Sequence, residues 1–155
     1  MSFKTIPVGI QPDAIETFAK VSADRAVEEL LWNAIDAEAT RIEVIFYENQ
    51  LEGMDKIVIS DNGHGISIDA AEDIFGSIGG SPKRLRRRSP NLDRPYHGKE
   101  GKGRYKAFSI GQNVTWHSRI LTNGSVQTFS VQLNSSQLNS ATIGSATACD
   151  YKVSK

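Results

Sequence analysis

The stretch that most constrains the fold of this chain covers residues 28–37, Glu-Glu-Leu-Leu-Trp-Asn-Ala-Ile-Asp-Ala. Its apolar residues recur at the spacing of one face of an α-helix, and Glu29, Asn33 and Asp36 fall on the opposite face. A polar stripe on an amphipathic helix is usually a solvent-exposed surface. The sequence predicts a helix over residues 22–38 with Ser22 as its N-cap. It leaves open whether the polar stripe is a solvated face or a site.

Two glycine-containing blocks further along the chain bear on this question. Residues 61–66, Asp-Asn-Gly-His-Gly-Ile, follow a predicted strand, and residues 98–103, Gly-Lys-Glu-Gly-Lys-Gly, precede a predicted helix. A carboxylate at the end of a strand can accept a hydrogen bond from an exocyclic amine such as that of adenine, although Asp-Asn-Gly is also a common Asx turn. The N–H groups at a helix start can bind phosphate, although a flexible glycine hinge has the same composition. Together with the polar helix face, the two blocks indicate a nucleotide pocket.

The overall composition predicts one folded domain. The chain has 155 residues, of which 39% are hydrophobic and 23% are charged. No apolar run approaches the ~18 residues of a membrane span, and the N-terminus lacks the pattern of a signal peptide. Cys149 is the only cysteine, which excludes an intrachain disulfide and a multi-cysteine zinc site. We expect a cytoplasmic protein with no membrane partner.

The formal net charge of zero hides an uneven distribution. Residues 1–81 contain 5 Lys and Arg against 15 Asp and Glu, whereas residues 82–106 contain 10 against 2. Such a basic segment indicates an anionic ligand or a nucleic acid nearby. Residues 76–98 are rich in glycine and proline, which predicts either a lid over a ligand or a disordered linker. The basic run from Lys83 to Arg88 lies within this segment.

The remaining elements follow from periodicity and turn residues. We predict helices over residues 12–20, 69–75 with Asp69 as its cap, and 101–110. We predict strands over residues 41–47, 56–60, 114–118 and 126–131, the last two joined by an Asn-Gly hairpin turn. Residues 134–148 are expected to form a loop with at most one weak edge strand. This order predicts an α/β (α+β) fold, a two-layer sandwich with a mixed, mainly antiparallel sheet and helices on one face.

The three polar blocks, in this order and spacing, resemble the GHKL superfamily, which includes gyrase B, the ninety-kilodalton heat-shock chaperone, histidine kinases and MutL. Residues 29–37 are similar to its N-box, and the Ala-Thr-Arg-Ile of residues 39–42 strengthens the likeness to MutL. Residues 61–66 match its Asp-x-Gly-x-Gly block. Residues 98–103, followed by Arg-Tyr, resemble the glycine-rich box of the chaperone. The resemblance implies a Bergerat-type fold that binds Mg-ATP.

The resemblance also implies roles for individual residues. Glu29 would be the general base, Asn33 the Mg²⁺ ligand and Asp61 the acceptor of the adenine amine. Asp36 would support the pocket through water, and Gly65 would border the base. The other residues expected to bind nucleotide lie in the Asp-x-Gly-x-Gly block, the lid and the glycine-rich box, and they are Gly63, Ile66, Ser81, Lys83, Gly98, Gly101, Lys102 and Gly103.

Two departures from the family pattern shape the functional expectation. The late Gly-Thr-x-Val/Ile strand is not found, and residues 1–155 contain no recognisable transducer domain. We therefore expect residues 1–155 to be one GHKL-type ATP-binding domain, with a lid over residues 76–100, forming the N-terminal fragment of a longer protein. The expected function is a Mg-ATP-binding module whose weak ATP hydrolysis drives conformational change, with downstream domains and an ATP-dependent homodimer as partners. The alternatives are a non-hydrolytic, nucleotide-sensing regulatory domain and a nucleic-acid-binding module that uses the basic lid.

Overall fold

The computed structural model describes residues 3–7, 21–76, 88–89, 91–97, 101, 103–122, 124–137 and 140–150. The predicted helix over residues 12–20 lies outside these residues. The described helices are α2 (Ala23–Asp36), α3 (Ile68–Gly76), α4 (Gly103–Lys106) and the 3₁₀ turn η2 (Ala107–Ser109). The described strands are β1 (Phe3–Pro7), β2 (Ile42–Glu48), β3 (Met54–Asp61), β4 (Asn113–Thr122), β5 (Ser125–Asn134), β6 (Ser140–Gly144) and β7 (Thr147–Asp150).

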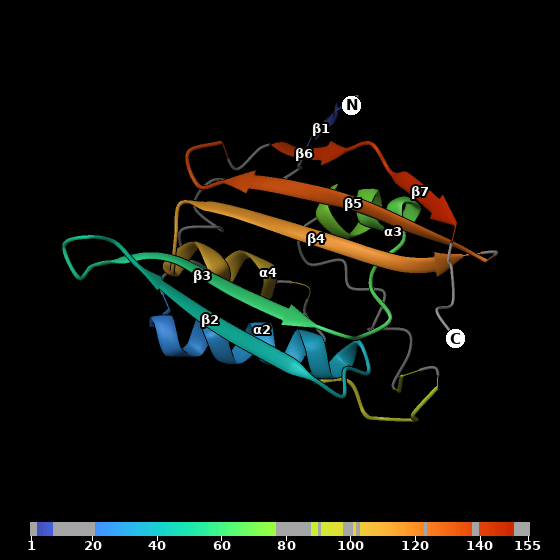
Figure 1. The fold of residues 1–155 in the computed structure, drawn as a ribbon, viewed down its shortest axis with the longest axis horizontal. Coiled ribbons are helices and arrows are strands. Elements are labelled where there is room, and N and C mark those ends of the chain that lie inside the picture. The colour runs from blue at the N-terminus through green and yellow to red at the C-terminus, as the bar shows by residue number, and fades with distance from the viewer. Residues whose placement is uncertain are drawn as a thin grey trace.

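The described strands form two sheets with helices on one side (Figure 1). Four strands follow the order β1-β6-β5-β4, β7 also pairs with β5, and β2 and β3 form a separate hairpin. Every pairing between these strands is antiparallel. In Figure 1, α3 lies behind the larger sheet and α2 behind the β2–β3 hairpin. The predicted α+β class, mainly antiparallel with helices on one face, is confirmed, although the described strands form two sheets.

The predicted hairpin between residues 114 and 131 is present as β4 and β5. Thr122 pairs with Ser125 across the turn, and Gly124 has φ +79°. A positive φ is readily adopted by glycine, which is why Asn-Gly favours such turns. From Phe129 to Leu133, residues of β5 alternate between the core and the outer face, because successive side chains of a strand point to opposite sides.

The expectation for residues 134–148 was wrong. β6 lies between β1 and β5, and Ala141 and Ile143 are 1% and 3% exposed. β7 follows it and pairs with β5 from Ser125 to Thr128. The segment is rich in small and hydroxyl residues, so its period-2 pattern of Ala141 and Ile143 is too weak to predict a central strand.

The main core lies between the larger sheet and α3. Phe75 is 2% exposed and Ala71 is fully buried, and both pack against inward-facing residues of β1, β5 and β6. The N-cap of α3 is Ser67, whose Oγ accepts the N–H of Ala70 at 3.2 Å. The predicted cap, Asp69, instead lies inside the first turn of the helix.

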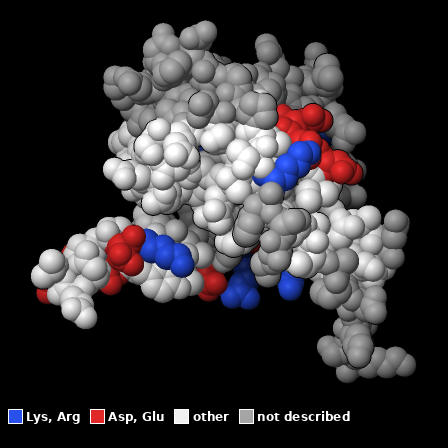
Figure 2. All heavy atoms as spheres, turned by 90° about the horizontal axis from the view of Figure 1, so that it is seen from above, with Lys and Arg blue, Asp and Glu red and all other residues white. Residues whose placement is uncertain are grey.

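The β2–β3 hairpin projects beyond the body of the molecule, and Figure 2 shows its tip from a second direction. Its tip carries Leu51 and Met54, which are 90% and 56% exposed. The turn is held by Asn49, whose Oδ1 accepts the N–H groups of Leu51 and Gly53. Among the described residues, none of the helices is both long enough and apolar enough to cross a membrane.

Candidate functional site

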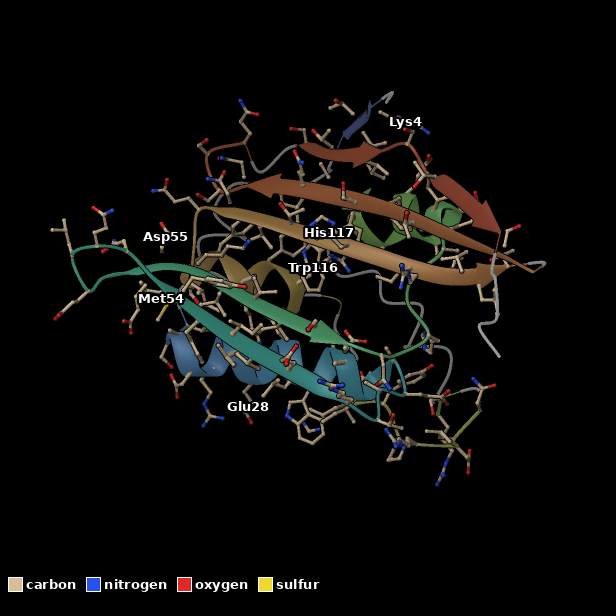
Figure 3. The ribbon with its side chains drawn as sticks, in the orientation of Figure 1. Lys4, Glu28, Met54, Asp55, Trp116 and His117 are labelled. Carbon is tan, nitrogen blue, oxygen red and sulfur yellow. The ribbon has the colours of Figure 1, made fainter. Side chains whose placement is uncertain are left out.

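The polar stripe of α2 faces the interior of the protein. Ala26 and Asp36 on this face are 0% and 2% exposed, and the Glu29 side chain is 21% exposed. The face packs against α4 and η2. Glu28, by contrast, projects from the side of α2 that is remote from the larger sheet (Figure 3), and its side chain is 49% exposed. The solvated-face interpretation of the stripe is therefore wrong for Asp36 and Glu29.

Glu29 lies where α2 meets α4. Its Oε2 accepts a hydrogen bond from Lys106 Nζ at 2.6 Å. Its Oε1 lies so close to Gly103 that a Cβ built there would be 2.1 Å away. The absence of a side chain at Gly103 is therefore what lets α4 approach the Glu29 carboxylate. The periodicity of α2 could not indicate Lys106, which is 77 residues away in the sequence.

The Asp61 turn packs against the C-terminal end of α2. Asp61 Oδ1 accepts the N–H of Gly63 at 2.8 Å, as in an Asx turn. The backbone of Gly63 approaches Ala37 so closely that a Cβ would lie 2.6 Å from the Ala37 carbonyl oxygen. That carbonyl accepts the N–H of His64 at 2.8 Å. Asp61 is exposed, and its Oδ2 has no hydrogen-bond partner among the described residues.

Asn62 ties this turn to the start of β2. Its Oδ1 accepts the N–H groups of Thr40 at 2.9 Å and Arg41 at 2.8 Å, and its Nδ2 donates to Thr40 Oγ1 at 2.8 Å. Three side-chain hydrogen bonds from one amide set the position of the neighbouring Asp61. Sequence reasoning overlooked this residue, since Asp-Asn-Gly is equally compatible with a simple turn.

The second half of the Asp-x-Gly-x-Gly block, Gly65 and Ile66, crosses β4. Gly65 has φ +69°, and a Cβ there would lie 2.5 Å from the Arg119 carbonyl oxygen. Ile66 is held through its backbone, because Ser118 Oγ accepts its N–H at 2.7 Å and donates to its carbonyl at 2.8 Å. The block is thus fixed between α2 and β4. Ser118 lies in an ordinary alternating strand, so no sequence signal identified it.

Part of the predicted lid is attached to the C-terminal end of α2 through Glu38. Its carboxylate accepts hydrogen bonds from Asn91 N at 2.8 Å, Asn91 Nδ2 at 2.7 Å and Leu92 N at 2.7 Å. Desolvation raises the pKa of Glu38, but these bonds and one from the Ser89 hydroxyl outweigh it and lower the pKa to about 2. The ionised Glu38 carboxylate therefore holds Ser89, Asn91 and Leu92 at the C-terminal end of α2.

A second set of contacts attaches the same segment. His97 N–H donates to Asp36 Oδ1 at 2.9 Å, and the His97 ring stacks on Trp32 with centroids 3.8 Å apart. Arg94 Nη1 donates to the Ala39 carbonyl at 3.2 Å. The buried carboxylate of Asp36, expected to support the nucleotide through water, thus binds the backbone of the predicted lid directly.

Several expected site residues have no described surroundings. Ser81, Lys83, Gly98 and Lys102 lie outside the described residues, as does most of the basic run. Arg88 is described, and its Nη1 is paired with Asp93 Oδ2 at 2.8 Å. Nucleic-acid binding by this run stays a prediction, which DNA binding at low salt would test.

Asn33 and Gly101 complete the expected set. Asn33 is half-buried on the inward face of α2, and its backbone carbonyl accepts the N–H of Ala37 at 3.0 Å. Gly101 has φ +68°, so the backbone of the glycine-rich box turns in the left-handed region just before α4.

Within the described part of the chain, no group of three or more His, Cys, Asp or Glu is placed to hold a metal ion. Mg²⁺ needs no such group, because it usually takes one or two protein oxygens together with phosphates and water.

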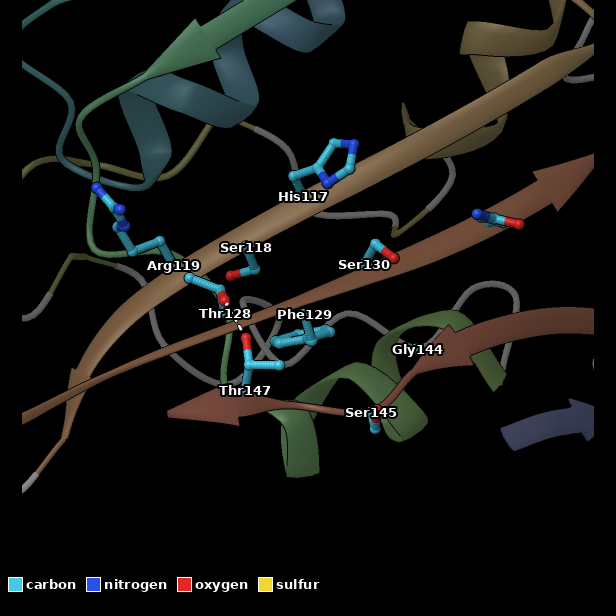
Figure 4. Close-up of a pocket in the computed structure, with 10 residues that line it drawn as sticks. His117, Ser118, Arg119, Thr128, Phe129, Ser130, Gly144, Ser145 and Thr147 are labelled. Atoms are coloured by element: carbon cyan, nitrogen blue, oxygen red, sulfur yellow. Dashed lines mark hydrogen bonds between the residues drawn. The ribbon is translucent and has the colours of Figure 1, made fainter. Parts of the chain in front are cut away.

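An open depression of about 460 Å³ lies elsewhere, over β4, β5 and the β6–β7 connection (Figure 4). His117 and Arg119 border it from β4, and Thr128 and Thr147, which also line it, hydrogen-bond to each other at 2.8 Å between β5 and β7. None of the residues expected to bind nucleotide lines it. The depression is therefore separate from the residues expected to bind nucleotide.

The comparison with known families agrees with the arrangement of the three blocks. A family model described as histidine kinase-, DNA gyrase B- and HSP90-like ATPase matches residues 21–153, which is more than half of the chain and contains all three blocks. None of the curated proteins compared with the chain matches it. A particular closeness to MutL or to the ninety-kilodalton chaperone stays a prediction. The chain belongs to the histidine kinase-, DNA gyrase B- and HSP90-like ATPase family, the GHKL superfamily, and is an ATP-binding domain of the ATPase type.

Proposed function

We propose that this domain binds Mg-ATP along the inward face of α2 and hydrolyses it slowly, with Glu29 as general base, Asn33 as Mg²⁺ ligand and Asp61 as adenine acceptor. The observation that carries the proposal is the orientation of α2. Its polar stripe faces the interior, with the Asp61 turn at one end and α4 at Glu29. Membership of the ATPase family supports ATP as the ligand.

The spacing along α2 supports this orientation of the nucleotide. Ala37 follows Glu29 by eight positions, which corresponds to ~12 Å along a helix, and Asn33 lies midway between them. Adenine bound at the Asp61 turn would leave the phosphates pointing along α2 towards Glu29. Asn33, one turn from each end on the same face, would meet the phosphates before Glu29 does.

The available atoms suit these roles. Asp61 uses Oδ1 in its turn and keeps Oδ2 for an exocyclic amine. The side-chain oxygen of Asn33 is a hard, uncharged ligand of the kind that Mg²⁺ accepts alongside phosphates and water, so the donor fits the ion. Bound Mg²⁺ would neutralise phosphate charge. Glu29 would accept a proton from a water that attacks the terminal phosphorus in line.

We further propose that hydrolysis drives a conformational change in a larger protein. Residues 88–97, part of the predicted lid over residues 76–100, are attached to the same helix that carries the proposed catalytic residues. Movement of the lid on nucleotide binding would therefore be transmitted to α2 through these contacts. Downstream domains of the same chain and an ATP-dependent homodimer are the partners we propose, with residues 1–155 acting as one domain.

Calorimetric titration tests the nucleotide pocket. Asp61→Asn keeps an oxygen for the Asx turn but replaces the second acceptor, and we expect Mg-ATP affinity to fall at least about fivefold, because an unpaired buried donor costs about 1–3 kcal/mol. Asn33→Ala should weaken binding only when Mg²⁺ is present. Asp55→Asn, on the same strand as Asp61, is the matched control and should bind as the parent does. Unchanged affinity in both test variants would remove the pocket assignment.

Phosphate release tests the base. Glu29→Gln should lower turnover about 100-fold while Mg-ATP affinity is retained, because general bases contribute ~10²–10⁴-fold. Glu28→Gln, one residue away on the outer side of α2, should keep the parent rate. If the parent binds ATP tightly without turnover, the domain is the non-hydrolytic regulatory alternative.

A further inference from the structure

The ion pair between Glu29 and Lys106 differs from the other described ion pairs in its burial. Its two side chains are 21% and 31% exposed, whereas the side chains in the other described pairs are between 46% and 79% exposed. Exposed pairs contribute little, because water screens them and ordering long side chains costs entropy. A pair that is shielded from water and 2.6 Å long is a stronger restraint on the carboxylate.

The two oxygens of Glu29 are constrained from two points of one short helix. Oε1 lies against Gly103 and Oε2 accepts from Lys106, which follows Gly103 by three residues and so lies on the same face of α4. The carboxylate is therefore restricted in rotation as well as in position. A general base needs such restriction, since a misplacement of ~1 Å can cost about 100-fold in rate.

We propose that Lys106 is a positioning residue for this reaction, which holds the Glu29 carboxylate in place to receive the proton of the attacking water. The inference rests on the proposed function and adds a residue to it. The competing role is that Lys106 binds a phosphate of the nucleotide directly. We favour positioning because Lys106 Nζ is already bonded to the carboxylate, and a phosphate contact would require this bond to break.

The two roles predict different kinetics. For Lys106→Met, positioning predicts that kcat falls about 10- to 100-fold while KM and the Kd for Mg-ATP change less than twofold. Lys106→Arg should restore most of the turnover, because it keeps a cationic donor. A phosphate ligand would instead raise the Kd for Mg-ATP together with the loss of kcat/KM. Lys56→Met, at an exposed position of β3, is the matched control and should behave as the parent.

A double-mutant cycle tests whether Lys106 acts through Glu29. In a Glu29→Gln background, Lys106→Met should lower turnover by less than about twofold further, because residues that act as a unit are not additive. If the two losses multiply, Lys106 has an independent role and the proposal is wrong. Gly103→Ala is a second variant that tests positioning, because its methyl group would displace the Glu29 carboxylate without removing Lys106. It should reproduce the loss of kcat even if Lys106→Met fails to fold.

A measurement without turnover separates this inference from the proposed function. Mg-ADP with aluminium fluoride imitates the transferring phosphoryl group with its attacking water, so Lys106→Met should weaken its binding about 10-fold and leave Mg-ADP binding unchanged. Equal binding by parent and variant would overturn the positioning role while the pocket stands. A parent that binds Mg-ATP but neither hydrolyses it nor gains affinity from aluminium fluoride would overturn both the hydrolysis and the role of Lys106.

Discussion

At the level of single residues, the glycines of the site differ in what surrounds them. At Gly103 the neighbour is the end of a flexible side chain, Glu29, which can move aside. At Gly63 and Gly65 the neighbours include the backbone carbonyl oxygens of Ala37 and Arg119. A clash with a backbone carbonyl must be relieved by moving two packed elements apart. The glycines of the Asp-x-Gly-x-Gly block therefore support the fold, and Gly103 makes room for a proposed catalytic side chain.

We expect Gly65→Ala to lower the free energy of unfolding by at least about 2 kcal/mol in urea titrations. A positive φ costs a non-glycine residue about 1–2 kcal/mol, and overpacking adds about 1–3 kcal/mol. Gly124→Ala is the matched control, because Gly124 also has a positive φ but has open space, with no atom within 4 Å, where the methyl group of an alanine would lie. Gly124→Ala should therefore lose only the contribution that comes from the positive φ. Equal losses in the two variants would show that contact with β4 is not what requires Gly65.

At the level of elements, α2 connects three parts of the molecule. Its inward face contacts α4, its C-terminal end contacts the Asp61 turn, and Glu38 and Asp36 hold residues 88–97. Glu38 itself has φ +64°, which a non-glycine residue rarely adopts. Its three hydrogen bonds to Asn91 and Leu92 compensate for this conformation. The Glu38 carboxylate therefore holds Asn91 and Leu92, and the Asp36 carboxylate holds His97.

We expect Glu38→Ala to release residues 91–92 from α2. Hydrogen–deuterium exchange of the Asn91 and Leu92 amides should become faster, because both amides donate to Glu38. Glu28→Ala on the same helix removes an exposed ion pair with Arg25 and should leave exchange at both amides unchanged. Exchange that stays as slow in Glu38→Ala as in the parent would show that other contacts hold the segment.

The low pKa of Glu38 also predicts a pH dependence. Its pKa is lowered from 4.5 to about 2 in the folded protein, so its contribution to stability is fully present above about pH 4.5 and is lost as the pH falls towards 2. In Glu38→Gln, thermal unfolding should therefore depend less on pH between about 4.5 and 2 than in the parent. The same slope in both proteins over this range would contradict the assignment of the carboxylate as the anchor.

At the level of the whole molecule, the core is built by strands and a helix that are distant in the sequence. β1 at the N-terminal end pairs with β6 near the C-terminal end, and both contact α3. Ile6, Phe75 and Ile143 belong to one buried cluster. The proposed nucleotide site does not lie in this core but beside it, where α2 and α4 meet and where Gly65 crosses β4.

We expect Ile143→Ala to destabilise the protein by about 2–5 kcal/mol, because it leaves a cavity in the core. Leu51→Ala, at a side chain that is 90% exposed, should change the free energy of unfolding by less than about 0.5 kcal/mol. Denaturant unfolding of the two variants measures both changes in the free energy of unfolding. A small loss in Ile143→Ala would mean that β6 is peripheral, as its composition first indicated.

The sequence by itself determined α2, the β4–β5 hairpin and the order of the three polar blocks. These features depend on contacts between near neighbours, such as helical periodicity and turn residues, so a single sequence contains their signal. Tertiary structure alone decided that β6 is central and that Lys106 binds Glu29 across 77 residues. It also decided that Glu38 holds Asn91 across 53 residues. Such contacts arise when distant segments pack together, and no local pattern specifies which donor will meet which carboxylate.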